Sequence, residues 1–235
     1  MKSIVFLAVS LLFAFTTHAN NPPLGGWFMY FGNMKFERSK ENQSNSESSK
    51  WNLNYDVQNR NNNFVSDLNQ MLIRGSIQYT WFNNLTLGSG YAFVHSEQFE
   101  KPDNPFGENR IFQDVVTNQQ IATATIKHRF RFEQRFIENQ NFKSRFRYQL
   151  GLDIPLYKNY AKEQNVYATV YNEIFMNTDQ ATRKTKPFDR NRLYFGAGFK
   201  VNPNLAFQLG YMNQMLQNVS YQQMMISLHH NLKIY

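Results

Sequence analysis

Alternating arginines are the residues of this sequence whose types and spacing could do chemistry. Residues 127–136 read KHRFRFEQRF, and every second position is polar: Lys127, Arg129, Arg131, Glu133 and Arg135. Guanidinium groups bind carboxylates and phosphates through charge-assisted hydrogen bonds. A row of them could therefore hold small anions or pair with carboxylates. The other positions are largely apolar: Ile126, Phe130, Phe132 and Phe136. A period of two is typical of a β-strand whose faces differ.

The same pattern returns later in the chain, at residues 144–156 and 190–201. If these strands share a sheet, their polar phases lie on one face. The candidate anion-contacting residues are Arg129, Arg131, Arg135, Arg145, Arg147, Arg190 and Arg192. The candidate counter-charges are Glu133, Asp153 and Glu173, with Asp56 on an earlier strand. Two interpretations of this face remain. Its charges could form salt bridges that only stabilise the interior, or the excess of arginine could attract anions.

Alternation and turn residues predict ten strands. They cover residues 26–36, 51–60, 69–81, 85–95, 122–137, 144–156, 166–175, 190–201, 205–215 and 224–235. Residues 110–117 form a weaker candidate. Single-chain bacterial barrels favour an even number of antiparallel strands. The sequence therefore predicts ten strands with 110–117 as a loop, or twelve with one strand not recognised.

The first nineteen residues predict a secretory signal. Lys2 precedes an apolar stretch, and small residues end at Ala19, so we expect cleavage there and a single mature domain over residues 20–235. The apolar stretch is too short for a spanning helix, which needs about 20 residues. An uncleaved anchor is the alternative. Repeated two-faced strands behind an export signal predict a barrel in the outer membrane, whereas a soluble periplasmic barrel would be extracted without detergent.

Energy decides which face would meet lipid. An arginine at the bilayer midplane costs roughly 2–4 kcal/mol, so five facing outward would cost on the order of 10 kcal/mol. That rivals the whole stability of a typical protein, about 5–15 kcal/mol. We therefore expect the aromatic faces to meet lipid and the arginines to face the lumen.

Composition excludes several classes of function. The chain has no cysteine, which excludes disulfides and zinc–thiolate sites. Its net charge is +8, but the basic residues alternate with apolar ones behind an export signal, so we expect no nucleic-acid partner. No metal-ligand motif is present, and we expect no metal and no cofactor.

Ser227 and His229 are two residues apart on the last predicted strand and so share a face. Such a pair could act as nucleophile and base in a membrane enzyme that acts on lipid. No acidic orienting residue, nucleophile-elbow glycine or oxyanion-hole motif accompanies it. We therefore expect no enzymatic activity and keep the pair as an alternative.

Several stretches resemble one known family. They are WFMYFGN (27–33), HRFRFEQRF (128–136), RFRYQLGLDIPL (145–156), YNEIF (171–175), FDRNRLYFGAGF (188–199) and LGYMNQ (209–214). They are similar to the family catalogued as domain of unknown function 2490. The resemblance implies an outer-membrane β-barrel of Gram-negative bacteria and no established activity.

The sequence thus predicts an all-β, antiparallel transmembrane barrel of ten to twelve strands. Its expected partners are outer-membrane lipid, the barrel-assembly machinery during insertion, and small anionic solutes. The first hypothesis is a narrow, porin-like channel or binder for such solutes. The alternatives are a closed structural barrel that presents loops to partners, and the lipid-modifying enzyme.

Overall fold

The fold was analysed in a computed structural model that describes residues 22–38, 47–97, 104–159, 164–179 and 186–234. The predicted signal sequence, residues 1–19, lies outside them. The described regular structure is all β-strand. No helix in these ranges is long and apolar enough to cross a membrane.

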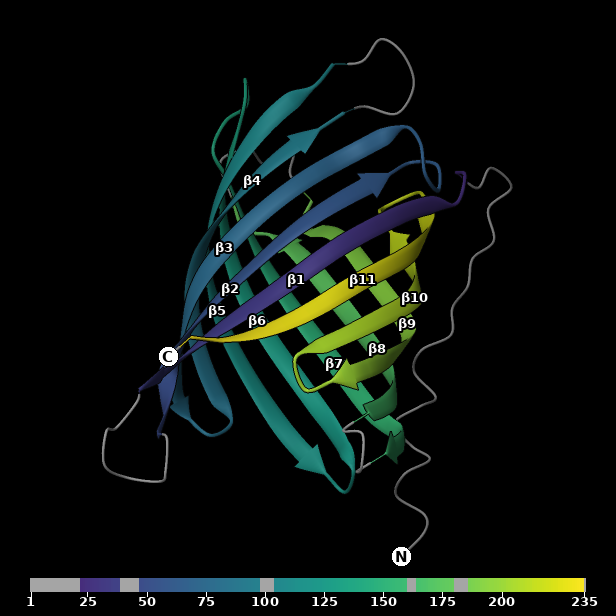
Figure 1. Ribbon diagram of the computed structural model, residues 1–235. Coiled ribbons are helices and arrows are strands. Elements are labelled where there is room, and N and C mark those ends of the chain that lie inside the picture. The colour runs from purple at the N-terminus through teal and green to yellow at the C-terminus, as the bar shows by residue number, and fades with distance from the viewer. Residues whose placement is uncertain (1–21, 39–46, 98–103, 160–163, 180–185, 235) are drawn as a thin grey trace, which may run out of the picture.

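Eleven strands form one closed barrel (Figure 1). Their bounds are β1 Gly25–Arg38, β2 Glu47–Asn61, β3 Leu68–Phe82, β4 Leu85–Ser96, β5 Phe106–Ile121, β6 Ala124–Ile137, β7 Lys143–Asn159, β8 Gln164–Asn177, β9 Phe188–Asn202, β10 Leu205–Met215 and β11 Ser220–Ile234. Each strand pairs with the next along the chain in antiparallel fashion.

The barrel closes through a parallel pair. β1 lies beside β11 from Gly25, opposite Gln223, to Phe36, opposite Ile234. In Figure 1 these are the purple and yellow strands. In a meander of odd strand number the first and last strands run in the same direction, so the closing pair must be parallel. The prediction of an even, wholly antiparallel barrel is therefore wrong, although eleven lies within the predicted range of ten to twelve.

The weak candidate at residues 110–117 is the centre of β5, so its interpretation as a loop is wrong. Its outward positions mix Ile111 and Val115 with Asn109 and Gln113. This mixture dilutes the alternation of apolar and polar residues, although the strand pairs along its length with β4 and β6.

The two ends of the barrel differ in their connections. β3–β4, β5–β6 and β9–β10 are each joined by two residues, at positions 83–84, 122–123 and 203–204. At the same end β1–β2 and β7–β8 are joined across positions 39–46 and 160–163. At the opposite end the connections are longer than the two-residue turns, at positions 62–67, 97–105, 138–142, 178–187 and 216–219. Because the strand number is odd, β1 begins at the long-connection end and β11 finishes at the short-turn end.

The sheet separates apolar and charged side chains. Large apolar residues are exposed on the outer face of every strand, among them Phe36, Val57, Ile73, Phe93, Ile111, Phe130, Leu150, Ile174, Phe195, Leu209 and Ile226. The buried inner positions hold many charged and polar side chains. The barrel thus has an apolar exterior and a polar interior, the reverse of a soluble protein.

Candidate functional site in the lumen

Ten arginines surround a central lumen cavity of about 190 Å³. They are Arg60, Arg74, Arg110, Arg129, Arg131, Arg135, Arg145, Arg147, Arg190 and Arg192. They come from β2, β3, β5, β6, β7 and β9. Each is on the inward phase of its strand, because the alternation that exposes the aromatic residues turns the arginines into the barrel.

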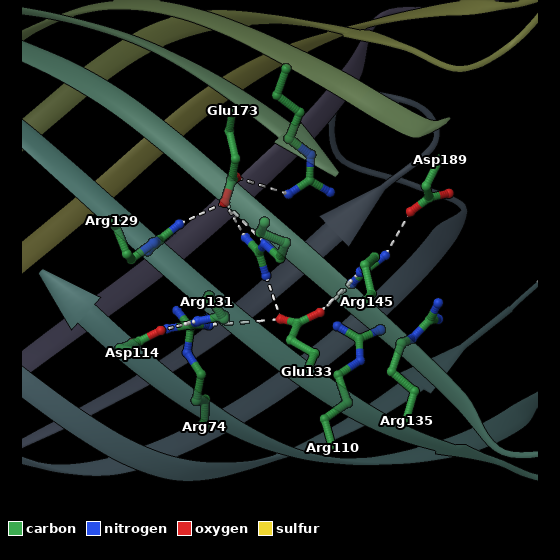
Figure 2. A network of polar contacts seen from close by, with 12 residues as sticks. Arg74, Arg110, Asp114, Arg129, Arg131, Glu133, Arg135, Arg145, Glu173 and Asp189 are labelled. Carbon is green, nitrogen blue, oxygen red and sulfur yellow. Dashed lines mark hydrogen bonds and ion pairs between the residues drawn. The ribbon is translucent and has the colours of Figure 1, made fainter. Parts of the chain in front are cut away.

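Glu133 lies at the centre of the arginine network (Figure 2). Its Oε2 accepts hydrogen bonds from Nη2 of Arg145 at 2.6 Å and from Nε at 3.0 Å. Its Oε1 accepts from Nη1 of Arg147 at 2.6 Å, and Nη1 of Arg131 lies 3.9 Å away. The carboxylate is 2% exposed, so these arginines replace the water that it lacks.

Glu173 is a second carboxylate at the same level. Its Oε1 accepts from Nη2 of Arg147 and from Nη2 of Arg129, at 2.6 and 2.7 Å. Arg147 therefore bridges Glu133 and Glu173, and the two carboxylates with their arginines form one connected layer across the lumen.

Further carboxylates extend this layer along the inner wall. Arg131 holds Asp114 through two bonds of 2.6 Å. Glu108 accepts two bonds of 2.7 Å from Arg110 and two more from Arg135.

Two other carboxylates lie farther from the centre. Asp189 accepts from Arg145 at 2.8 Å and from Arg190 at 3.1 Å. Asp56 accepts from Arg74 at 2.6 Å. Six carboxylates thus face ten arginines in the described lumen, and positive charge remains in excess.

Comparison with known proteins shows the family to which this chain belongs. A sequence profile of the family described as "Protein of unknown function (DUF2490)" matches residues 24–225. The chain belongs to this family. An uncharacterized protein of Methylorubrum extorquens AM1 is 30% identical over 164 residues, which cover 68% of this chain and 69% of the relative. No solved structure matches. The family assignment confirms the resemblance seen in the sequence, and DUF2490 brings no known activity.

All seven arginines predicted from the sequence of this DUF2490 chain line the central cavity. Of the predicted counter-charges, Glu133 and Glu173 join the arginine layer. Asp153 does not, because it pairs with Lys127 nearer the short-turn end, where its side chain is more exposed. Asp56 faces the lumen beside Arg74.

Sequence reasoning missed three arginines and three carboxylates of the layer. Arg110, Glu108 and Asp114 belong to β5, whose weak alternation hid them. Asp189 precedes the predicted start of its strand. Arg60 and Arg74 were identifiable, because each shares the inward phase of its strand with other polar residues.

Aromatic rings support the arginine layer from within the lumen. The guanidinium carbon of Arg131 lies 4.0 Å from the ring centroid of Phe112, and that of Arg147 lies 4.4 Å from that of Phe175. Both rings are 1% exposed. The layer lies beside the 190 Å³ cavity and beside a second lumen pocket of about 410 Å³, which Arg74, Arg129 and Arg131 also line.

The predicted Ser227–His229 pair is present. Ser227 Oγ lies 2.9 Å from His229 Nε2, and the imidazole stacks on Phe31 with centroids 4.9 Å apart. No carboxylate hydrogen-bonds this imidazole among the described residues. Ser227 is buried on the inner face, away from the apolar exterior. The pair thus lacks both an orienting acid and a route to lipid.

Within the described ranges, no three His, Asp or Glu side chains are grouped so that they could hold a metal ion. The charged groups that line the central cavity are mainly guanidinium groups.

Proposed function

We propose that this chain is an outer-membrane β-barrel whose lumen binds small anionic solutes and acts as a narrow, anion-selective path. One observation carries the proposal: ten arginines face six carboxylates around the central cavity. An excess of positive charge in a confined, low-dielectric space attracts anions and repels cations.

Membrane residence is supported by the outer face. Apolar and aromatic side chains are exposed around the whole barrel, and in water such a surface would drive aggregation. Lipid is the solvent that fits it, and the barrel-assembly machinery is the expected partner during insertion. Bacterial outer-membrane barrels have short periplasmic turns and long extracellular loops. By that rule the long-connection end of this barrel faces outward.

A closed structural barrel is the second candidate, and the buried Glu133–Arg147–Glu173 layer favours it. Such a barrel would present its long connections to partners and conduct no current. Lipid chemistry at Ser227 has less support, because that hydroxyl faces the lumen.

Planar-bilayer recording of the refolded protein under a salt gradient tests the proposal. We expect small current steps with a reversal potential shifted toward the anion. Arg129→Gln should reduce that shift, because Arg129 is the most exposed side chain of the Glu173 group at 26%. Lys186→Gln, in the exposed β8–β9 connection, is the matched control for charge. Cation-selective steps would overturn the proposal. Silence from a folded, inserted protein that also binds no anion would favour the closed barrel.

Orientation can be tested with single cysteines, since the chain has none of its own. Ser66→Cys lies in the exposed connection between β2 and β3, and Asn84→Cys lies in the turn between β3 and β4 at the other end. On intact cells a membrane-impermeant maleimide should label the first and spare the second. The reverse pattern would invert the proposed orientation, and labelling of neither variant with recovery in the soluble fraction would argue against the outer membrane.

A further inference from the structure

Arg60 differs from the other lumen arginines in its partners. It is 7% exposed, yet it is the one arginine of the described lumen with no carboxylate oxygen within 4.0 Å. Its guanidinium donates to Oε1 of Gln58 at 2.7 and 3.1 Å and to Oε1 of Gln70 at 2.9 Å. These acceptors are neutral. A buried charge without a counter-charge is unfavourable, so the site favours an anion that supplies one.

Arg192 lies nearby, and only part of its guanidinium group is hydrogen-bonded. Its side chain donates from Nε to Gln214 Oε1 at 2.8 Å. The carboxylate nearest to it is Glu173, with Oε2 4.0 Å from Nη1, and Glu173 already accepts from two other arginines. Within the described residues, Nη1 and Nη2 of Arg192 make no hydrogen bond. These N–H groups are available to a ligand in the cavity that Arg192 lines.

Trp27 brings the two arginines together. The guanidinium carbon of Arg60 lies 4.0 Å from the indole ring centroid, and that of Arg192 lies 5.0 Å from it. Trp27 is 6% exposed and packs against Met225, so the indole holds a fixed position on the lumen wall. Two positive charges converge on one rigid ring, and both line the central cavity of about 190 Å³.

The location of this group suggests how a ligand would reach it. Trp27 is near the start of β1 and Arg60 near the end of β2, so both lie toward the long-connection end. Arg145, which pairs with Glu133, is two residues from the start of β7 at the same end, so this group and the salt-bridged layer lie at similar depths. A solute from the long-connection side would therefore reach both.

We propose that Arg60 and Arg192, held against Trp27, form an oxyanion subsite that takes a phosphate or carboxylate group. This deepens the proposed function, on which it rests for the route of entry. Guanidinium groups match both oxyanions with paired N–H donors, and the bound group would provide the counter-charge that Arg60 lacks. The glutamines that already accept from the arginines keep the guanidinium groups in place.

Trp27 provides a reporter for the test. The chain has three tryptophans, and Trp51 and Trp81 are exposed on the outer face. Trp51→Phe together with Trp81→Phe leaves Trp27 as the only indole. Inorganic phosphate and, separately, acetate are titrated into the refolded protein in detergent, with ionic strength held constant. We expect a saturable change in Trp27 fluorescence with at least one of them, which also identifies the preferred oxyanion.

Substitution distinguishes the subsite from general attraction to a basic lumen. Arg60→Gln should weaken binding at least tenfold, and Arg192→Gln should weaken it in the same direction. Lys143→Gln removes one positive charge at the same end of the barrel and should leave binding unchanged. Equal affinity in Arg60→Gln and the parent, or no saturable response to either anion, would overturn the subsite.

A thermal melt gives a readout that does not depend on the reporter. Phosphate should raise the melting temperature of the parent and leave that of Arg60→Gln unchanged. Without anion, Arg60→Gln should melt no lower than the parent, because it removes an uncompensated charge. Loss of stability in Arg60→Gln would contradict this.

The subsite and the channel can fail separately. Anion-selective current without oxyanion binding at Trp27 would overturn the subsite and leave the channel. Binding at Trp27 in a barrel that never conducts would remove the channel and keep the subsite.

Discussion

The two walls of this lumen pack in different ways. On the charged wall, β6 to β8 contribute Glu133, Arg145, Arg147 and Glu173, and each of these charged groups bonds to a specific partner. On the apolar wall, β1, β9, β10 and β11 contribute the cluster of Trp27, Met29, Tyr194, Met212 and Met225. The charged wall fixes directions through hydrogen bonds, whereas the apolar wall is stabilised by burial as in a soluble core. One closed sheet can therefore be filled by either chemistry.

Glycines make the apolar wall possible. A Cβ on Gly196 or on its neighbour across the strands, Gly210, would lie 2.2 Å from the hydroxyl of Tyr194. The tyrosine ring lies over both glycines and reaches Gln208, whose Nε2 donates to its hydroxyl at 2.8 Å. The missing side chains leave the room that one large aromatic ring fills.

The largest effect is expected on the charged wall, from Glu133→Gln. The change keeps the volume but removes the negative charge that three arginines surround, and breaking a buried ionic group costs about 3–5 kcal/mol. Denaturant unfolding of the refolded barrel measures the loss. Glu138→Gln, the same change in the exposed β6–β7 connection, is the control and should cost little. Equal stability of the two variants would mean that water compensates Glu133.

Much of the fold could be predicted because alternation is a local signal. The strand pattern, the inward phase of the arginines and the tight turns at positions 83–84 and 203–204 all follow from residues close in sequence. The strand number could not be fixed, because β5 mixes polar residues into its outward phase. The parallel closure of β1 on β11 depends on that number, and no local residue encodes it.

The candidate site, like the fold, could be predicted only as far as local alternation allows. The phase of a strand says which face a side chain lies on, and this placed the arginines inside. Which carboxylate meets which basic residue depends on register across strands, as when Asp153 meets Lys127 and Glu108 meets Arg135. The missing counter-charge of Arg60 is a property of the assembled lumen, and the sequence carries no sign of it.

On the apolar wall, Met212→Ala should destabilise the barrel by about 2–5 kcal/mol, through lost burial and the cavity left behind. Met212 is fully buried. Met212→Leu keeps most of the buried volume and should recover most of this loss, because this site needs only apolar bulk. Denaturant titrations of the two variants provide the comparison. If Met212→Leu is as unstable as Met212→Ala, the apolar wall depends on more than burial.

A smaller effect is expected when the apolar wall is overpacked. Gly210→Ala inserts a methyl group against Tyr194 and should cost about 1–3 kcal/mol. Gly75→Ala is the matched control, since a Cβ there would meet no atom within 4 Å. Thermal melts of the two variants measure the difference. If Gly210→Ala melts with the parent, the tyrosine can move and the apolar wall is looser than its burial indicates.

The smallest effect should come from replacing a whole ion pair on the charged wall. The Arg131 guanidinium donates two hydrogen bonds to the Asp114 carboxylate, and it also stacks on the Phe112 ring. Either single change, Arg131→Met or Asp114→Leu, leaves a buried charge and should cost about 3–5 kcal/mol, while the double variant should stay within about 1 kcal/mol of the parent. A double-mutant cycle from denaturant unfolding measures this. If the double variant is as unstable as the singles, the charged wall acts as one cooperative unit through Glu133, which lies 3.9 Å from Arg131. If it is as stable as the parent, this ion pair adds little net stability, and the reason for arginine there lies in what the lumen binds.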